Sequence, residues 1–390
     1  MNGAGPPADG RAAFRRILHV TESLGAGVAT AIGSYADNSQ WADHYLLAAA
    51  RDGEDVGTDM RAKLKGVWIV RRKWEIPARL RSLFARLQPD HVHAHSSYGG
   101  AFARLSLLPP GRVIYTPHCY SFERRDVGWP ARLAFGLMEQ ALSVGGRRIA
   151  AVSGREARLA ARMLGRPEVI LLPNCASVPD ALAAASRRKG SGPPLRVGMA
   201  GRITAQKGAD FFAATHAALG RLSRDFRFVW LGGGAPDMER AMLSQGIEVS
   251  GWQSQAATLQ DLAGCHVYFH SAAWEGMPLS LLEAAALRLP IVARRIPALE
   301  DLDGLRLVGS PGEAAAALAA LRDEAARESL AQAAGALNRR FSREAQAAAL
   351  SRLYGAAAPA TACEAGAAQP PARPGRPDRA GQESRDAARG

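Results

Sequence analysis

Residues 195–208, LRVGMAGRITAQKG, decide the fold of the second half of the chain. The apolar run Leu195–Ala200 is typical of a buried strand, and a helical pattern over 210–222 follows the two glycines. A strand, a glycine-bounded loop and a helix in this order form the first unit of a doubly wound parallel sheet. The sequence therefore predicts that this half folds as an α/β domain.

The same order recurs on both sides of this stretch. Further strands are expected in the second half at 226–231, 247–250, 267–270 and 291–293, with helices between them. In the first half they are expected at 16–20, 44–50, 67–70, 91–94, 112–116, 148–152 and 169–172, with helices at 77–87, 100–108 and 131–144. Strands that alternate with helices predict parallel sheets covered on both faces.

A linker divides the chain into two such domains. The segment 183–194, AAASRRKGSGPP, has the small, polar and proline-rich composition of a linker. The tail contains almost no large apolar residue, so it cannot offset the entropy lost on ordering. We therefore expect a flexible N-terminus (1–15), a first domain (16–183), a linker (184–194), a second domain (195–342), a docking helix (343–355) and a disordered tail (356–390).

The charge balance is strongly basic. The formal net charge is +13, and the excess is densest over 61–86, where Glu75 is the one acidic residue. Trp68 and Trp74 are interleaved with these basic residues. Such a segment attracts nucleic acid, an anionic membrane surface or a phosphorylated substrate.

Several patterns indicate no chemistry of their own. No apolar run approaches the ~20 residues that a membrane-spanning helix needs, and the start of the chain does not resemble a signal peptide. The four cysteines form neither metal spacing nor a disulfide framework. Asp301-Leu302-Asp303 resembles a metal-binding D-x-D, but it follows no clear strand and is interpreted as a solvated turn.

In open parallel sheets, ligands bind where the carboxyl ends of strands lead into helix N-termini. The first such loop holds Gly25 and Gly27, which allow the backbone to approach a ligand closely. Later loops place His95 in HAHSS and His118 in TPHCY, where imidazoles can bind sugar hydroxyls or handle protons near neutral pH. The spacing of the histidines fits no usual zinc site, so no metal is expected.

Two loops of the second domain suit a phosphorylated sugar. Arg202 and Lys207 lie between Gly201 and Gly208, where a guanidinium, an ammonium and a helix N-terminus together favour a diphosphate. The segment 274–283, WEGMPLSLLE, places Glu275 before a helix and Glu283 two turns inside it. We expect Pro278 in the first turn and the helix to run to about Leu289. Free amides at its start can face an anion while the carboxylates bind hydroxyls.

At this point the chain resembles glycosyltransferase family 4, which comprises retaining enzymes of the GT-B fold. The resemblance rests on E-x₇-E at Glu275 and Glu283 and on the G-R-x₄-K-G loop at 201–208, and it covers about residues 16–355. It implies two Rossmann-like doubly wound parallel-sheet domains that face each other across a cleft. The first would bind the acceptor and the second the nucleotide-sugar donor. One departure is Cys175, because the family often has Pro-Asn-Gly where this chain has Pro-Asn-Cys.

The resemblance also implies roles for particular residues. Arg202 and Lys207 would bind the donor diphosphate, and Glu283 the ribose. Glu275 would hold sugar hydroxyls, while His118 would face the reacting sugar from the first domain; these two are the candidate catalytic residues. The remaining candidates would contribute loops and backbone groups: Gly276, Met277, Pro278 and Leu279 on the donor side, and Gly25, Gly27 and His95 on the acceptor and phosphate side.

The implied activity is retaining transfer of a sugar from a UDP- or GDP-sugar to an acceptor, without metal or other cofactor. The acceptor would be a lipid-linked glycan intermediate of bacterial surface polysaccharide synthesis. The protein would be cytoplasmic and peripheral at the inner membrane face through 61–86. A nucleotide-sugar epimerase of the same fold and a basic nucleic-acid-binding protein are the alternatives. The two signature loops favour transfer over epimerisation, and the basic residues match no nucleic-acid-binding motif, so no nucleic-acid partner is expected.

Overall fold

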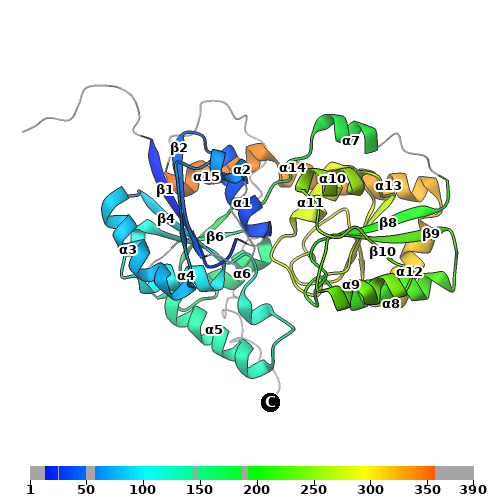
Figure 1. Ribbon diagram of the computed structural model, residues 1–390, viewed down its shortest axis with the longest axis horizontal. Helices are drawn as coiled ribbons and strands as arrows, with labels where there is room; N and C mark the ends of the chain where they lie inside the picture. The colour runs from blue at the N-terminus through cyan, green and yellow to red at the C-terminus, as the bar shows by residue number, and fades with distance from the viewer. Residues whose placement is uncertain (1–13, 25, 50–57, 145–147, 187–191, 356–390) are drawn as a thin grey trace, which may run out of the picture. The chain divides into compact units, whose positions relative to one another are not determined.

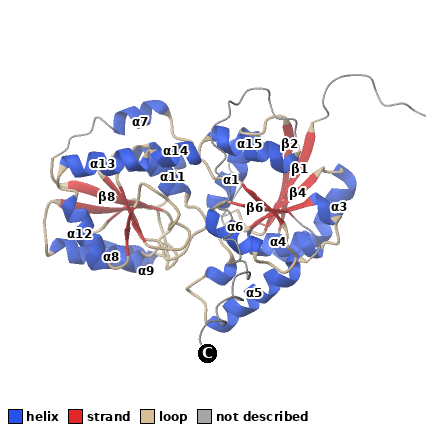
Figure 2. Ribbon diagram, turned by 180° about the vertical axis from the view of Figure 1, so that it is seen from behind, coloured by secondary structure: helices blue, strands red, loops and turns tan. Residues whose placement is uncertain are grey.

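The computed structural model describes residues 14–24, 26–49, 58–144, 148–186 and 192–355. Gly25, the tail expected at 356–390 and most of the N-terminal segment lie outside these residues. Within them, all paired strands are parallel and form two sheets, one in each predicted domain (Figures 1 and 2).

The first sheet has seven strands in the order β3-β2-β1-β4-β5-β6-β7. The strands are β1 (Arg15–Thr21), β2 (Ala42–Ala49), β3 (Gly66–Val70), β4 (His91–His95), β5 (Val113–Thr116), β6 (Arg148–Ala151) and β7 (Glu168–Leu171). The helices are α1 (Ala26–Asp37), α2 (Thr58–Ala62), α3 (Ile76–Leu87), α4 (Ser96–Leu105), α5 (Trp129–Ser143) and α6 (Gly154–Ala161). Short 3₁₀ turns lie at η1 (Lys73–Glu75), η2 (Pro110–Arg112) and η3 (Ser121–Glu123).

Alternation along β1 sends side chains to the two faces of this sheet. Leu18 and Val20 pack with α3 and α4, whereas Ile17 packs with α1 on the other face. Buried strands of a parallel sheet are apolar on both faces, which explains the uninterrupted run in β1. His19 lies among these residues on β1 and is fully buried.

The second sheet has six strands in the order β10-β9-β8-β11-β12-β13. The strands are β8 (Leu195–Ala200), β9 (Phe226–Leu231), β10 (Glu248–Val249), β11 (Val267–His270), β12 (Ile291–Arg294) and β13 (Arg306–Val308). The helices are α7 (Asp180–Ser186), α8 (Ala209–Gly220), α9 (Pro236–Ser244), α10 (Gln255–Ala263), α11 (Leu279–Ala286), α12 (Pro311–Ala320), α13 (Glu324–Ala334) and α14 (Ala336–Arg340). Figure 1 shows α8, α9 and α12 on one face of the sheet and α10, α11 and α13 on the other.

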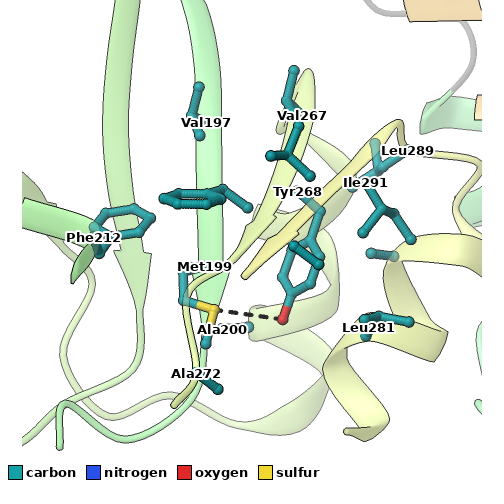
Figure 3. Packing of buried hydrophobic residues seen from close by; sticks show 14 of the residues in the cluster. Val197, Met199, Ala200, Phe212, Val267, Tyr268, Ala272, Leu281, Leu289 and Ile291 are labelled. Atoms are coloured by element: carbon teal, nitrogen blue, oxygen red, sulfur yellow. Dashed lines mark hydrogen bonds between the residues drawn. The ribbon is translucent and has the colours of Figure 1, made fainter. Parts of the chain in front are cut away.

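The core of the second domain forms around its two central strands. Val197 and Met199 of β8 and Tyr268 of β11 are fully buried, and Phe212 of α8 packs with them (Figure 3). The Tyr268 hydroxyl lies 3.6 Å from the Met199 sulfur and donates to the Ser280 hydroxyl at 2.8 Å. This packing anchors the start of α11 to the carboxyl end of the sheet.

The last described helix, α15 (Arg343–Tyr354), returns to the first domain. Leu350, Leu353 and Tyr354 are fully buried in the core that contains Ile17. The Gln346 amide donates to the Pro173 carbonyl oxygen at 2.8 Å. The first domain is therefore built from two separate stretches of the chain.

Some of the helix boundaries predicted from the sequence are wrong. The helix expected from residue 100 begins at Ser96, because the Glu22 carboxylate accepts from the Ser96 hydroxyl and the Gly99 amide and so satisfies its first turn. The helix after Pro278 ends at Ala286 rather than near Leu289, because Arg288 takes a left-handed φ of 55°. Pro278 itself is the N-cap of α11, with extended backbone, rather than a first-turn residue.

Apart from the additional edge strand β7, the two sheets share one strand order, so each has a topological switch point. In the first sheet it lies between β1 and β4, and in the second between β8 and β11. At such a point neighbouring strands lead into helices on opposite faces, which opens a crevice at their carboxyl ends. Most of the candidate site residues lie at the ends of these strands or in the loops after them, whereas His118 follows the next strand, β5.

Candidate functional site

An ion pair occupies the switch point of the second sheet. The Lys207 ammonium, after β8, lies 2.6 Å from a Glu275 carboxylate oxygen, after β11, and the two side chains are 22% and 11% exposed. Gly208 makes this approach feasible: it has a φ of 70°, and a Cβ there would lie 2.1 Å from the Ser271 carbonyl oxygen. The structure thus brings together two predicted site residues that lie far apart in the sequence.

Glu283 lies in α11 and is buried. Burial raises the pKa of its carboxyl group, while a hydrogen bond from the Gln255 amide at 3.3 Å and the charge of Lys207 act to lower it. A buried carboxyl group is costly unless it is hydrogen-bonded, and the hydroxyls of a bound ligand can supply such bonds.

Arg202 lies exposed on the same loop as Lys207, with its guanidinium 5.8 Å from the centre of the Trp252 ring. Sequence reasoning missed Trp252. The signal that was available is a tryptophan directly after Gly251, in the loop that follows β10. An aromatic face beside a basic loop holds the guanidinium and offers a stacking surface.

The His118 loop follows β5 and has an unusual backbone. His118 and Cys119 have φ values of 52° and 88°, a conformation that costs energy for residues other than glycine. A fully buried Glu156 holds the loop, since one carboxylate oxygen accepts from the Cys119 amide at 2.6 Å and the other from the Val152 amide at 3.0 Å. Burial raises the pKa of Glu156 to about 7.

Glu156 was missed because its sequence context suggests only a helix cap. Ser153 precedes it by three residues, which is the pattern of a capping box. The Ser153 hydroxyl does accept from the Glu156 amide at 3.3 Å. The Glu156 carboxylate, however, accepts from the Cys119 and Val152 amides rather than from the Ser153 amide of a capping box.

The His118 loop packs directly against the E-x₇-E segment. A Cβ at Gly276 would lie 2.8 Å from the Cys119 nitrogen, 3.0 Å from the His118 carbonyl carbon and 2.7 Å from Glu156. The Asn174 amide donates to the Met277 carbonyl oxygen at 2.9 Å. Cys175 is not among the described residues with positive φ, so this segment needs no glycine there. The His118 loop therefore lies beside Glu275 and the backbone of Gly276 and Met277.

Histidines also fill the switch point of the first sheet. His95 and His118 hydrogen-bond at 3.1 Å, and His95 in turn bonds His19 at 2.9 Å. His19 bonds His44 at 2.9 Å. Sequence reasoning singled out only His118 and His95 of these four, because His95 ends its strand and His118 lies in a loop, whereas His19 and His44 lie inside strands. Burial lowers the pKa of each, to about 4 for His44 and His118.

His19, His93 and His95 form the group of described residues whose spacing would suit a metal. Each ring nitrogen already has a hydrogen-bond partner, because His93 bonds Thr116 at 2.7 Å and Tyr354 at 2.8 Å. A metal would have to break these bonds. The expectation that no metal is needed stays a prediction.

The remaining predictions fall outside the centre of the site. Gly27 is exposed in the first turn of α1, and a Cβ there would contact nothing within 4 Å. Its neighbour Gly25 is not described.

Asp301 lies in a turn as expected, but it pairs with Arg158 at 2.5 Å and the neighbouring Leu302 is buried. The turn is therefore only partly solvated.

Two cavities border the site, and each contains one carboxylate of the E-x₇-E segment. The larger, of about 840 Å³, is lined by Glu283, Leu279 and Gln255 together with Thr30 and Gly33 of α1. The smaller, of about 160 Å³, is lined by Glu275 and three arginines, namely Arg125, Arg132 and Arg155. Glu275 thus shares its cavity with three arginines, whereas the larger cavity of Glu283 is lined by Lys63 and Arg343 among its basic residues.

Two family models match the chain. The model described as "Glycosyl transferase 4-like domain" matches residues 15–175, and the model described as "Glycosyl transferases group 1" matches residues 194–324. Between them they span both parallel sheets almost completely. Among curated proteins, an uncharacterized 41.2 kDa protein in the cps region of Klebsiella pneumoniae is 21% identical over 310 residues, covering 74% of this chain and 84% of that protein.

Solved structures of similar fold include Anabaena HepE in complex with UDP and glucose. It superposes with a TM-score of 0.67 at 15% identity, covering 87% of this chain and 99% of that one. Sucrose-phosphate synthase from Thermosynechococcus elongatus has a TM-score of 0.71 at 15% identity, with 87% and 98% covered. A UDP-forming trehalose-phosphate synthase from Burkholderia xenovorans has a TM-score of 0.63 at 14% identity, with 87% and 100% covered. At these identities the likeness shows the GT-B fold.

Proposed function

The chain belongs to the group 1 glycosyl transferases, and from this membership we propose that it transfers a sugar from a nucleotide diphosphate to an acceptor with retention of configuration. The observation that carries the proposal is the Lys207–Glu275 ion pair at the switch point, beside the buried Glu283. A cation for phosphate and carboxylates for hydroxyls are the groups that a nucleotide-sugar requires.

In this proposal the donor rearranges the ion pair. The diphosphate takes over the Lys207 ammonium, and Glu275, released from it, accepts hydrogen bonds from the sugar hydroxyls. Lys207 and Arg202 then stabilise the negative charge that develops on the leaving phosphate. The departing diphosphate accepts the acceptor proton on the same face of the sugar. The new glycosidic bond therefore forms on the face from which the old one breaks.

A UDP-sugar is our proposed donor. HepE structures contain UDP and glucose in one case and UDP-glucose in another, and the Burkholderia trehalose-phosphate synthase is described as UDP-forming.

The proposed acceptor is a lipid-linked glycan of a surface polysaccharide. The cps-region relative supports a role in such a polysaccharide, and the three arginines beside Glu275 suit an acceptor that carries phosphate. Trp74, which is 64% exposed among the basic residues of 61–86, supports a peripheral contact with anionic lipid. So does the exposed row of Trp129, Leu133 and Leu137 on α5. None of the described helices is long and apolar enough to span a bilayer.

A thermal-shift panel with UDP, GDP, ADP and dTDP tests the donor site. We expect UDP to raise the unfolding temperature, with or without magnesium, because a ligand of the folded state stabilises it by ~2.7 kcal/mol at a hundredfold excess over its dissociation constant. Lys207→Ala should abolish the shift. Arg196→Ala is the matched control, since Arg196 pairs with Glu248 away from the site. A shift that survives in Lys207→Ala would refute the assignment.

Retention requires a second measurement. Proton NMR of the first product formed from a UDP-α-sugar should show an α-linkage before any later mutarotation. A β-linked product would refute the retaining mechanism while leaving the donor site intact.

A further inference from the structure

Four imidazoles form a continuous hydrogen-bonded chain across the first sheet, and a serine closes its inner end. In order, the chain runs through Ser39, His44, His19, His95 and His118, from β2 across β1 and β4 to the loop after β5. The successive distances are 3.0, 2.9, 2.9 and 3.1 Å. The first four residues are buried, and His118 is partly buried.

The inner end has a fixed direction. The Ser39 hydroxyl donates to the Tyr35 carbonyl oxygen at 2.5 Å, so its single proton is committed. The Ser39 carbonyl oxygen, 3.4 Å from His44 Nε2, can only accept. His44 Nε2 therefore carries a proton and donates to Ser39, which leaves His44 Nδ1 as an acceptor.

This direction propagates because a neutral imidazole has one N–H and one lone pair. His44 Nδ1 accepts from His19 Nε2, so His19 Nδ1 must accept from His95 Nε2. His95 Nδ1 in turn accepts from His118 Nε2. Burial lowers the pKa of all four rings, which keeps them neutral near pH 7.

The outer end of the chain is His118 Nδ1. It has no hydrogen-bond partner within the described part of the chain, and it is not one of the buried polar atoms that lack a partner. It is therefore open to solvent, on a loop whose backbone contacts Gly276 beside Glu275.

We propose that Ser39, His44, His19 and His95 are positioning residues that hold His118 in its Nε2–H tautomer, so that Nδ1 presents a lone pair to a substrate hydroxyl. The tautomer follows from the hydrogen bonds alone. The identity of the hydroxyl, on the donor sugar or on the acceptor, rests on the proposed function. A chain of this kind also resists rotation of the His118 ring, since rotation would break the bond to His95.

Long-range ¹H–¹⁵N NMR of the full chain labelled with ¹⁵N-histidine reads each tautomer directly, with the His118 signals assigned from His118→Gln. In the wild type we expect a protonated Nε2 and a bare Nδ1 at His118. His19→Phe removes the acceptor of His95 Nε2–H. His95 should then donate from Nδ1 to His118 Nε2, because a buried N–H without a partner is costly. His118 should switch to its Nδ1–H tautomer.

Two variants make the test specific. In His19→Gln the side-chain carbonyl can accept from His95 and the amide can donate to His44, so the wild-type tautomer should return. His93→Phe is the matched control, because His93 packs 4.3 Å from His95 between ring centres but bonds Thr116 and Tyr354 instead of the chain. Turnover should fall roughly tenfold in His19→Phe and recover in His19→Gln. The affinity for UDP should be the same in the wild type and in all of these variants.

A wild-type His118 protonated at Nδ1 would overturn the proposal, and so would an unchanged His118 tautomer in His19→Phe. Stoichiometric Zn²⁺ that displaces the protons of His19, His93 and His95 would also overturn it, in favour of a metal site. The wild-type spectrum decides the question even where a variant does not fold. If the tautomers are as expected but no sugar donor is turned over, the positioning stands and the proposed function fails.

Discussion

The two switch points have the same topology and opposite chemistry. Between β8 and β11 a charged pair, Lys207 and Glu275, lies partly open at the carboxyl end of the sheet. Between β1 and β4 the equivalent position is filled by uncharged imidazoles buried in the sheet itself. The strand order decides where a crevice opens, whereas the side chains decide which ligand suits it. In the proposed function, the second switch point binds phosphate and the first binds hydroxyls.

The largest effect that we expect is on stability at low pH. Acid should destabilise the first sheet more than the second. Unfolded histidines take up protons below about pH 6.5, whereas burial holds the folded pKa of His44 at about 4. The free energy of unfolding therefore falls as the pH drops through this window, by roughly 3 kcal/mol for one such histidine. Glu156 acts in the opposite direction: its folded pKa of about 7 makes its contribution fall as the pH rises. The histidines outnumber it.

Amide hydrogen exchange measured at several pH values checks this prediction. Strands β1, β2 and β4 should lose protection at a higher pH than β8 and β9, because the first sheet holds four buried histidines among its described strands and the second holds one, His270 of β11. Equal loss in both sheets would show that the imidazole chain does not set the acid stability.

Glu275→Gln should separate binding from transfer at the second switch point. The variant removes the charge that competes with a diphosphate for Lys207, so UDP should bind as tightly as in the wild type or more tightly. Transfer should slow by ten- to a hundredfold, since a hydrogen bond to a charged group contributes about 1.5–3 kcal/mol. Isothermal titration and a UDP-release assay measure the two effects. Weaker UDP binding in the variant would contradict the exchange of partners proposed for Lys207.

Gly276→Ala tests the contact between the two loops. The added Cβ would lie closer than 3 Å to the Cys119 nitrogen and to Glu156, so we expect a loss of about 1–3 kcal/mol in stability and a fall in turnover. Gly220→Ala is the control, because a Cβ there meets nothing within 4 Å. It should be neutral or stabilising by about 0.4–1 kcal/mol. Thermal unfolding that ranks the two variants equally would argue against the packed contact.

Asn174→Ala should have the smallest effect. It removes the hydrogen bond to the Met277 carbonyl oxygen, which contributes about 0.5–1.5 kcal/mol. Asn338→Ala loses a similar bond, to the Ala285 carbonyl oxygen, within the second domain. Denaturant unfolding should show comparable losses, but only Asn174→Ala should also lower turnover. If both variants, or neither, lower turnover, the Asn174 bond has no special place in the site.

The sequence predicts the second switch point better than the first. The Arg202–Lys207 loop and the Glu275–Glu283 segment are each a contiguous motif of fewer than ten residues, so each can be recognised in the sequence alone. Both follow strands with clear apolar runs. The Lys207–Glu275 pair itself was not predicted and required the structure, because it depends on the strand order that makes β8 and β11 neighbours.

The imidazole chain could not be read in the same way. His19 and His44 lie within apolar strands, where a single histidine is expected to be an ordinary core residue. Their contact depends on β1 lying between β2 and β4 and on the register that places His19 opposite His93. Glu156 was hidden for a similar reason, since its partner Cys119 lies 37 residues earlier in the chain.

The return of α15 to the first sheet has a consequence for biosynthesis. Tyr354 fills the core beside Ile17 and bonds His93, yet it is translated after every residue of the second domain. The first domain therefore cannot complete its core on the ribosome until the second has emerged, even though its sheet is made first. A nascent chain stalled before residue 343 would expose an apolar groove on the α1 side of that sheet, and would be a natural client for chaperones.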